Sequence, residues 1–251
     1  MPDRNRVLKA LQKLELLIVQ DIFLTETVRL ATVVLPAATA AEKSGSFTSV
    51  DNRVQCFNRA VAPIGLALAD AEVLTKLYNL VAPVSAISGQ SAEELHREIT
   101  TLTGLYNETC DHEGCRMGRV KNRVAFSDRP AKFVAVTPTA VAAYDQAYPF
   151  CLTLGSILHH NGSMTLWSDN NMNVAGQAYV SVNPADAARI GLAAGATAKV
   201  TSEVGSVALS IQLSENVQTG ALFVPSHFRE SLAGILLKGS ANTAAVKLEK
   251  S

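Results

Sequence analysis

Residues 110–115 bring together side chains of the types that bind metals. Two thiols, Cys110 and Cys115, flank an Asp, a His and a Glu. Such a cluster could clip a metal ion, but tetrahedral zinc takes four ligands and iron–sulfur clusters usually take four cysteines. Because charge and glycine are also frequent from residue 106 to 129, the favoured interpretation is a surface connection, and no metal site is predicted.

A second candidate is the adjacent pair His159 and His160, in a polar segment that follows an apolar run at residues 150–154. Two imidazoles on one loop could bind a metal, but no carboxylate or thiol lies near them in the sequence. The sequence also contains no Ser–His–Asp or Cys–His arrangement, phosphate-binding loop or paired-carboxylate motif. We therefore predict no catalytic residue in this chain.

The composition excludes several classes of function. Lys plus Arg and Asp plus Glu number 22 each, so no net charge favours binding to nucleic acid or to an acidic membrane. No apolar run approaches the roughly 20 residues that cross a bilayer, and the first residues lack the pattern of a signal peptide. The four cysteines are too scattered for a disulfide framework. We expect a cytoplasmic protein that is peripheral to the inner membrane through partner subunits.

The first half of the sequence predicts a compact βαβ unit. Residues 16–22 and 32–35 are apolar runs typical of buried parallel strands, and Thr25 can cap a short helix at residues 26–31 between them. The crossover should be right-handed. Further helices are predicted at residues 3–14, 70–81 and 91–104, and further strands at residues 54–62 and 132–136.

The second half is typical of a small β-sandwich or barrel. Short strands are predicted at residues 150–154, 178–182, 197–202, 206–213, 221–224 and 244–248, with regular turn signals between them. Asn183 and Pro184 predict the start of a helix that ends at Gly191.

Residues 19–55 carry a long series of family-specific positions. These are VQDIF at 19–23, Thr25, Thr27, VVLP at 33–36, Glu42, Gly45, Phe47, Thr48 and RVQ at 53–55. The series resembles the late part of the molybdopterin oxidoreductase family, which includes formate dehydrogenases, nitrate reductases and the large peripheral subunit of NADH-quinone oxidoreductase, respiratory complex I. The resemblance implies that iron–sulfur and further α/β domains lie upstream, so we expect the chain to be a C-terminal portion.

Residues 180–207 carry the second resemblance. Their pattern, v-x-v-N-P-x-D-A-x-x-x-G-h-x-x-G-x-x-h-x-V-x-S-x-x-G-x-h, resembles the molybdopterin-dinucleotide-binding domain, a six-stranded double-psi β-barrel. The expected fold class is therefore α/β, with a partial parallel α/β domain at residues 1–143, followed by the barrel at residues 144–251.

The resemblance also implies where a cofactor would bind. In relatives that carry molybdopterin guanine dinucleotide, loops after the parallel strands and loops of the barrel hold it. The corresponding positions are Gln20, Asp21, Thr25, Thr27, His159 and His160. A carboxylate can accept two donors from a guanine edge, and hydroxyls near a helix N-terminus can hold phosphate oxygens. A structural role is the alternative, with Thr25 as a cap and Asp21 accepting backbone N–H groups.

Departures from the family pattern favour a branch without the cofactor. Gly155 stands where relatives often place a phosphate-binding Arg, and an expected Asn is absent or displaced at residues 233–242, where Lys238 can partly substitute. The first hypothesis is therefore a structural region of the large peripheral subunit of NADH-quinone oxidoreductase, with no molybdenum, iron or zinc of its own. The alternative is a fragment of a formate-dehydrogenase-like molybdoenzyme that binds molybdopterin guanine dinucleotide. An independent double-psi-barrel binding protein is the third hypothesis.

The resemblance and the apolar strands together predict partners. The run at residues 16–35 is nearly uniformly apolar, as in strands that are covered on both faces. An uncovered apolar edge is rare in soluble proteins. We expect upstream domains or other subunits of a respiratory dehydrogenase complex to cover it, with no nucleic acid and no direct membrane insertion.

Overall fold

The computed structural model divides the chain into two compact units. It describes residues 3–50, 53–89, 91–103, 106, 110–112, 115–119, 133–135, 146–160, 162, 164–229, 232–239 and 241–251. One unit comprises Met1–Lys13 and Val136–Ser251, and the other comprises Leu14–Ala135. The boundary expected between residues 143 and 144 lies outside the described residues.

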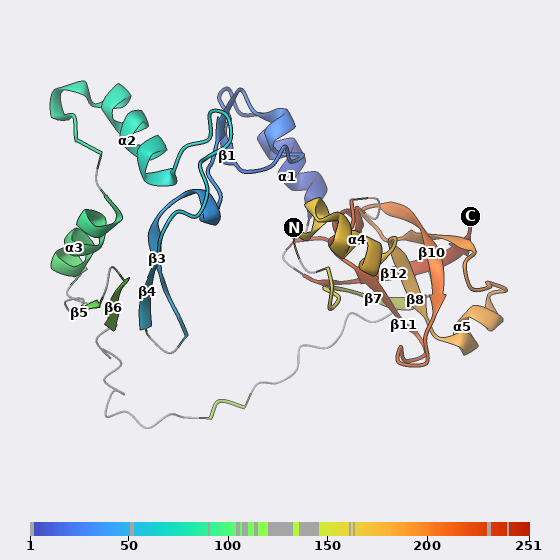
Figure 1. Cartoon of the computed structure of the whole chain (residues 1–251). Helices are drawn as coiled ribbons and strands as arrows, with labels where there is room; N and C mark the ends of the chain where they lie inside the picture. Colours follow the sequence, from blue (N-terminus) through green and yellow to red (C-terminus); the bar gives the residue numbers. More distant parts are fainter. Residues whose placement is uncertain are drawn as a thin grey trace. The chain divides into compact units, whose positions relative to one another are not determined.

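The first unit contains a closed barrel of six strands (Figure 1). They are β7 (Phe150–Gly155), β8 (Tyr179–Val182), β9 (Thr197–Thr201), β10 (Ser206–Leu213), β11 (Ala221–Pro225) and β12 (Thr243–Lys250). Their order around the barrel is β10-β8-β11-β7-β12-β9. β7 pairs with β11 and β8 pairs with β10 in parallel, whereas the other neighbours are antiparallel. This mixed barrel confirms the predicted six-stranded double-psi fold.

Alternating side chains fill the barrel interior. On β7, Phe150, Leu152 and Leu154 are buried, whereas Thr153 is exposed. The same cluster takes in Val180, Val200, Leu209, Leu222 and Val246 from the other strands. Inward and outward positions alternate along a barrel strand, which explains why the period-two pattern of the sequence predicts these strands well.

Short helices connect the barrel strands. They are η4 (Thr165–Trp167), α4 (Asp169–Ala175), α5 (Pro184–Arg189) and η5 (Ala233–Leu236). Asn183 caps α5 as predicted, because its Oδ1 accepts the N–H of Ala185 at 2.9 Å. Gly191, which follows α5, has φ = 69°, a left-handed conformation that glycine adopts without strain.

The first helix, α1 (Arg4–Leu11), belongs with the barrel and not with the α/β region that follows it. Asp3 caps it through Oδ1, which accepts the N–H of Arg6 at 3.3 Å. The other oxygen of Asp3 accepts the N–H of Gly239 at 3.1 Å, and Asn5 Nδ2 donates to the carbonyl of Val204 at 3.3 Å. These bonds attach the start of the chain to turns of the barrel.

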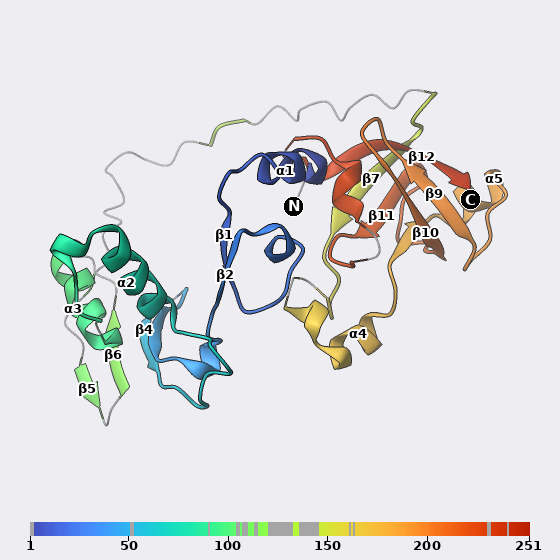
Figure 2. The same ribbon diagram turned by 90° about the horizontal axis from the view of Figure 1, so that it is seen from above.

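The second unit begins with a parallel pair, β1 (Ile18–Asp21) and β2 (Val33–Pro36), which lie side by side in Figure 2. The helix predicted at residues 26–31 is wrong in extent, because only a 3-10 turn, η1 (Val28–Leu30), forms there. Two threonines and a valine at residues 25–28 explain the difference, since β-branched side chains favour helix weakly.

The rest of this unit combines a small sheet with helices. The sheet has the order β3-β4-β6-β5, with β3 (Gly45–Thr48), β4 (Arg53–Phe57), β5 (Cys110–His112) and β6 (Cys115–Arg119). The helices are η2 (Ala40–Glu42), α2 (Asp70–Val81), η3 (Pro83–Ser85) and α3 (Ala92–Thr103). Residues 110–112 and 115–119, predicted to be part of a surface connection, instead pair as strands. The strand predicted at 132–136 is absent from its described part, Phe133–Ala135.

The two units differ in how much apolar surface they bury. In the second unit, the buried apolar side chains among the described residues are Val28, Ala38, Val54 and Val73. Its parallel strands leave Ile18, Val33 and Val34 from 41% to 47% exposed. No described helix is long and apolar enough to cross a membrane.

Candidate ligand site at the end of the barrel

Two loops leave the barrel side by side. β7 and β11 are parallel neighbours, with Gly155 opposite Pro225, so their carboxyl ends meet at one edge. The carbonyl of Gly155 accepts both the N–H of Ser226, at 2.9 Å, and its hydroxyl, at 3.1 Å. The segments after residue 155 and after residue 225 are therefore tied together where they begin. Ligands of parallel strands commonly bind at such carboxyl ends.

Gly155 has a packing reason to be glycine. A Cβ at this position would lie 3.0 Å from a ring carbon of Phe223, closer than most side chains come to each other. An Arg here, as relatives often have, would displace that ring. The guanidinium expected from this position must therefore come from elsewhere if the site binds a phosphate.

His160 is the buried polar residue of the first loop, with 0% of its surface exposed. Its Nδ1 lies 2.7 Å from the hydroxyl oxygen of Thr165, and that hydroxyl donates to the carbonyl of Gly162 at 2.7 Å. A hydroxyl has a single proton, and here the carbonyl receives it. Nδ1 of His160 must then carry the ring proton and donate it to Thr165. This network assigns a neutral imidazole whose Nε2 presents a bare lone pair.

That lone pair has no partner among the described residues. The ring of Phe228 lies edge-on at 4.6 Å from the ring of His160, and the ring of His227 lies at 6.1 Å. A buried acceptor left unpaired costs about 1–3 kcal/mol, and each such group in a folded protein calls for an explanation. A donor from a bound molecule would satisfy it.

His227 stays neutral beside His160. Burial lowers the pKa of His227, and the neighbouring His160 lowers this pKa further. An imidazolium would be desolvated at this position, which disfavours the charged form. The pair therefore offers uncharged acceptors rather than a positive site.

Arg229 supplies a cation near these rings. Its guanidinium carbon lies 4.0 Å from the ring centroid of Trp167, which belongs to η4. Arg229 was missed in the sequence because it follows β11, far along the chain from the loop where an Arg was expected. The signal that could have found it is the run His227-Phe228-Arg229 directly after a parallel strand. Sequence reasoning likewise missed His227, Phe228 and Thr165 as neighbours of His160.

The two adjacent histidines do not act together. His159 is exposed, and its backbone carbonyl accepts from Asn171 Nδ2 at 3.4 Å, whereas His160 is buried. No group of three metal-ligating side chains was found within the part of the chain that the structure describes. Cys110 and Cys115 lie on the neighbouring strands β5 and β6, in register with Met117 and His112.

The other predicted positions lie in the second unit and make bonds of their own. Asp21 Oδ1 accepts the N–H of Phe23 at 3.0 Å, and the hydroxyl of Thr25 accepts the N–H of Val28 at 3.4 Å. Gln20 Nε2 donates to Asp70 Oδ1 at 2.7 Å. Thr27 is exposed at the start of η1 and makes no side-chain capping bond. Asp21 and Thr25 thus make the bonds of the structural alternative.

Glu42 is a buried carboxylate that the sequence did not single out as structural. Its Oε2 accepts the N–H of Thr39 at 2.8 Å and its Oε1 accepts the N–H of Ile64 at 3.2 Å. The bond to the Thr39 backbone is the largest cause of a lowered pKa at Glu42. Glu42 therefore joins η2 to the segment before α2.

Comparisons with known proteins agree with this arrangement. Residues 1–80 match the family model "Molybdopterin oxidoreductase", and residues 150–247 match "Molydopterin dinucleotide binding domain". The chain is 36% identical over 249 residues to NADPH-Fe(3+) oxidoreductase subunit alpha of Geobacter sulfurreducens, covering 99% of this chain and 28% of that protein. It is 34% identical to F420-dependent formate dehydrogenase subunit alpha of Methanocaldococcus jannaschii, covering 99% of this chain and 39% of that protein.

More distant relatives extend the comparison. The NADH-quinone oxidoreductase subunit of Rhizobium meliloti that is designated G 2 is 29% identical, with 99% of this chain and 28% of that protein covered. Acetylene hydratase from Pelobacter acetylenicus has a similar fold, with a TM-score of 0.77 at 15% identity over 100% of this chain and 42% of that one. The chain thus spans less than half the length of these relatives. The family matches and the relatives that align along the whole chain show that it belongs to the molybdopterin oxidoreductase family.

Proposed function

We propose that the barrel binds molybdopterin guanine dinucleotide through the loops after β7 and β11, within a large subunit of a multi-subunit oxidoreductase. The observation that carries this proposal is the buried, unpaired Nε2 of His160. The match of residues 150–247 to a dinucleotide-binding domain supports it. So do the names of the relatives, which are subunits of NADPH-dependent, F420-dependent and quinone-linked oxidoreductases.

The residues present fit the chemistry of this group. Guanine and pterin carry N–H donors, and ribose carries hydroxyls, so each could donate to the lone pair of His160. Arg229 would attract the phosphates, in place of the Arg that Gly155 excludes. When bound, the cofactor supplies the pterin that ligates molybdenum. The part assigned to this chain is to hold and orient the dinucleotide and to exclude water from it.

A second candidate is a structural region without molybdenum, as first expected for the large peripheral subunit of NADH-quinone oxidoreductase. The bonds that Gln20, Asp21 and Thr25 make within the chain favour it, since side chains already satisfied have less to offer a ligand. Both candidates include partner subunits, and peripheral membrane attachment in the cytoplasm would come through them.

Titration calorimetry of the full chain with molybdopterin guanine dinucleotide released from a molybdoenzyme separates the candidates. We expect micromolar binding that His160→Phe weakens about tenfold, because one hydrogen bond into a buried site is lost. The matched control is His159→Phe, which changes the exposed neighbour and should leave the affinity unchanged. Absence of binding to the unaltered chain would establish the structural candidate, and equal effects of both substitutions would remove His160 from the site.

A further inference from the structure

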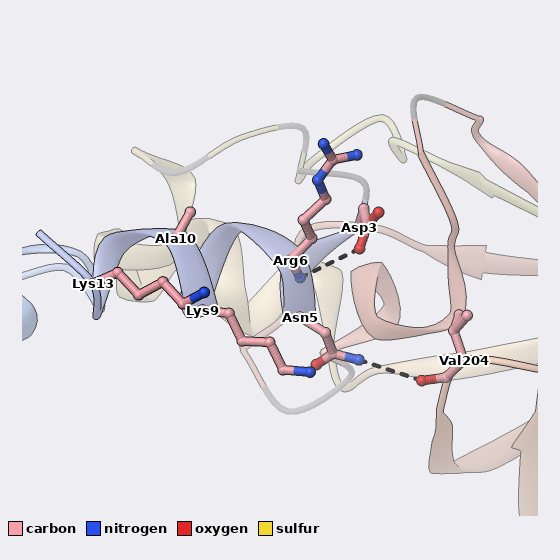
Figure 3. A pocket seen from close by; sticks show the side chains of 7 residues that line it. All are labelled: Asp3, Asn5, Arg6, Lys9, Ala10, Lys13 and Val204. Carbon is pink, nitrogen blue, oxygen red and sulfur yellow. Dashed lines mark hydrogen bonds between the residues drawn. The ribbon is translucent and has the colours of Figure 1, made fainter.

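A basic pocket lies between α1 and a turn of the barrel, away from the loops after β7 and β11. It has a volume of about 570 Å³ and is lined by Asp3, Asn5, Arg6, Lys9, Ala10, Lys13 and Val204 (Figure 3). The helix and the turn belong to the same compact unit. The bond from Asn5 Nδ2 to the carbonyl of Val204 fixes the helix against the turn at one side of the pocket.

The charges in this pocket are unbalanced, although the whole chain has no net charge. Arg6, Lys9 and Lys13 make no ion pair with any described carboxylate. The acid that shares the pocket, Asp3, already accepts two backbone N–H groups. The nearby acid Glu203 lies 3.8 Å from Lys238 instead. Three cations therefore surround a concave surface without a partner of opposite charge.

We propose that this pocket binds an acidic segment of a partner protein. Lys9 and Lys13 lie along one side of the helix, and Arg6 extends away from both (Figure 3). Four residues of helix rise about 6 Å, so the two lysines match carboxylates that are spaced along a chain. Complementary charge of this kind sets the orientation and the association rate of partners.

A small phosphate ligand fits the pocket less well. Phosphate prefers convergent donors, commonly at the N-terminus of a helix, where the dipole is positive. Lys9 and Lys13 lie at the opposite, C-terminal end of α1. Lysines at this end also suit the helix dipole, but the dipole does not account for the third cation, Arg6, or for the concave surface between them.

Fluorescence anisotropy with a labelled oligoglutamate peptide tests the proposal on the full chain. At low ionic strength we expect binding that Lys9→Glu with Lys13→Glu weakens about tenfold or more, since two attractive contacts become repulsive. Binding should also weaken at about 0.15 M salt, where the screening length falls to about 8 Å. Both lysines are exposed, and circular dichroism would verify that the variant is folded.

The matched control is Lys247→Glu with Lys250→Glu, which reverses the same number of charges on β12, outside the pocket. It should leave peptide binding unchanged, as should His160→Phe, because this pocket does not depend on the dinucleotide site. No binding to the unaltered chain, or equal weakening in the control, would overturn the proposal. Displacement of the peptide by micromolar pyrophosphate would overturn it in favour of a phosphate ligand.

Discussion

At the scale of single residues, the buried polar groups of the barrel divide into satisfied and unsatisfied ones. Asp186 is 3% exposed, and its two oxygens accept from Arg189 Nη2 and from the N–H of Gly220, each at 2.6 Å. It closes the turn before β11 and needs nothing further. His160 is more deeply buried and has one nitrogen without a partner among the described residues. This contrast marks the loop of His160, and not the family motif around Asp186, as the place for a ligand.

His227 should make the barrel sensitive to acid. Because burial lowers its pKa in the folded state, the unfolded chain binds a proton at a higher pH, near 6.5. The stabilisation is complete above that pH and is lost as the pH falls through it toward the lowered pKa of the folded state. We expect the free energy of unfolding, measured with urea, to decline less between pH 7 and pH 5 in His227→Gln than in the unaltered chain. Parallel pH profiles would contradict the assignment.

At the scale of elements, the sequence predicts the barrel far better than the first half. The strand predicted at residues 206–213 has the bounds of β10, because alternating burial imposes a period of two. The helix predicted around η1 is too long, since one turn is enough to connect β1 and β2. The hairpin of β5 and β6 escapes prediction because CDH and CRMGR carry no apolar alternation, and its pairing with β4 comes from tertiary structure.

The candidate site shows the same limit. His160 is a candidate from the sequence, but nothing in the sequence distinguishes it from His159, which the structure leaves exposed. Arg229 and His227 become neighbours of that loop only because β7 and β11 pair in parallel. A pairing between distant segments cannot be read from local periodicity.

Glu42 should control how firmly η2 is joined to the segment before α2. Its two oxygens bond the N–H groups of Thr39 and Ile64, so Glu42→Ala should leave both amides without partners. We expect hydrogen exchange at these two amides to accelerate in this variant, whereas barrel amides should be unchanged. Because the carboxyl pKa is lowered in the folded state, the same bonds should weaken as the pH falls below about 4.5. Exchange rates that do not change at Thr39 and Ile64 would show that the two bonds contribute nothing.

At the scale of the whole molecule, the two units have unequal cores. The large cluster of buried apolar side chains lies in the barrel unit. The second unit exposes apolar side chains along α2, where Leu74, Leu80 and Val81 are from 61% to 85% exposed. Apolar surface of this kind usually marks an interface. The barrel therefore has the core of an independent domain, whereas the second unit is expected to need a partner.

Limited proteolysis of the isolated chain tests this difference. Regions with few buried apolar contacts open at low free energy, and proteases cleave what opens. We expect the first cleavages within residues 106–129, followed by loss of the second unit, and a resistant fragment that contains Tyr148 to the C-terminus. Leu152→Ala, which removes a fully buried side chain of β7, should destabilise that fragment by about 2–5 kcal/mol and make it degradable. Leu80→Ala, at an exposed position of α2, is the control and should leave the fragment resistant. If both units of a monomer resist cleavage equally, the second unit is stable alone and its exposed apolar side chains do not require a partner.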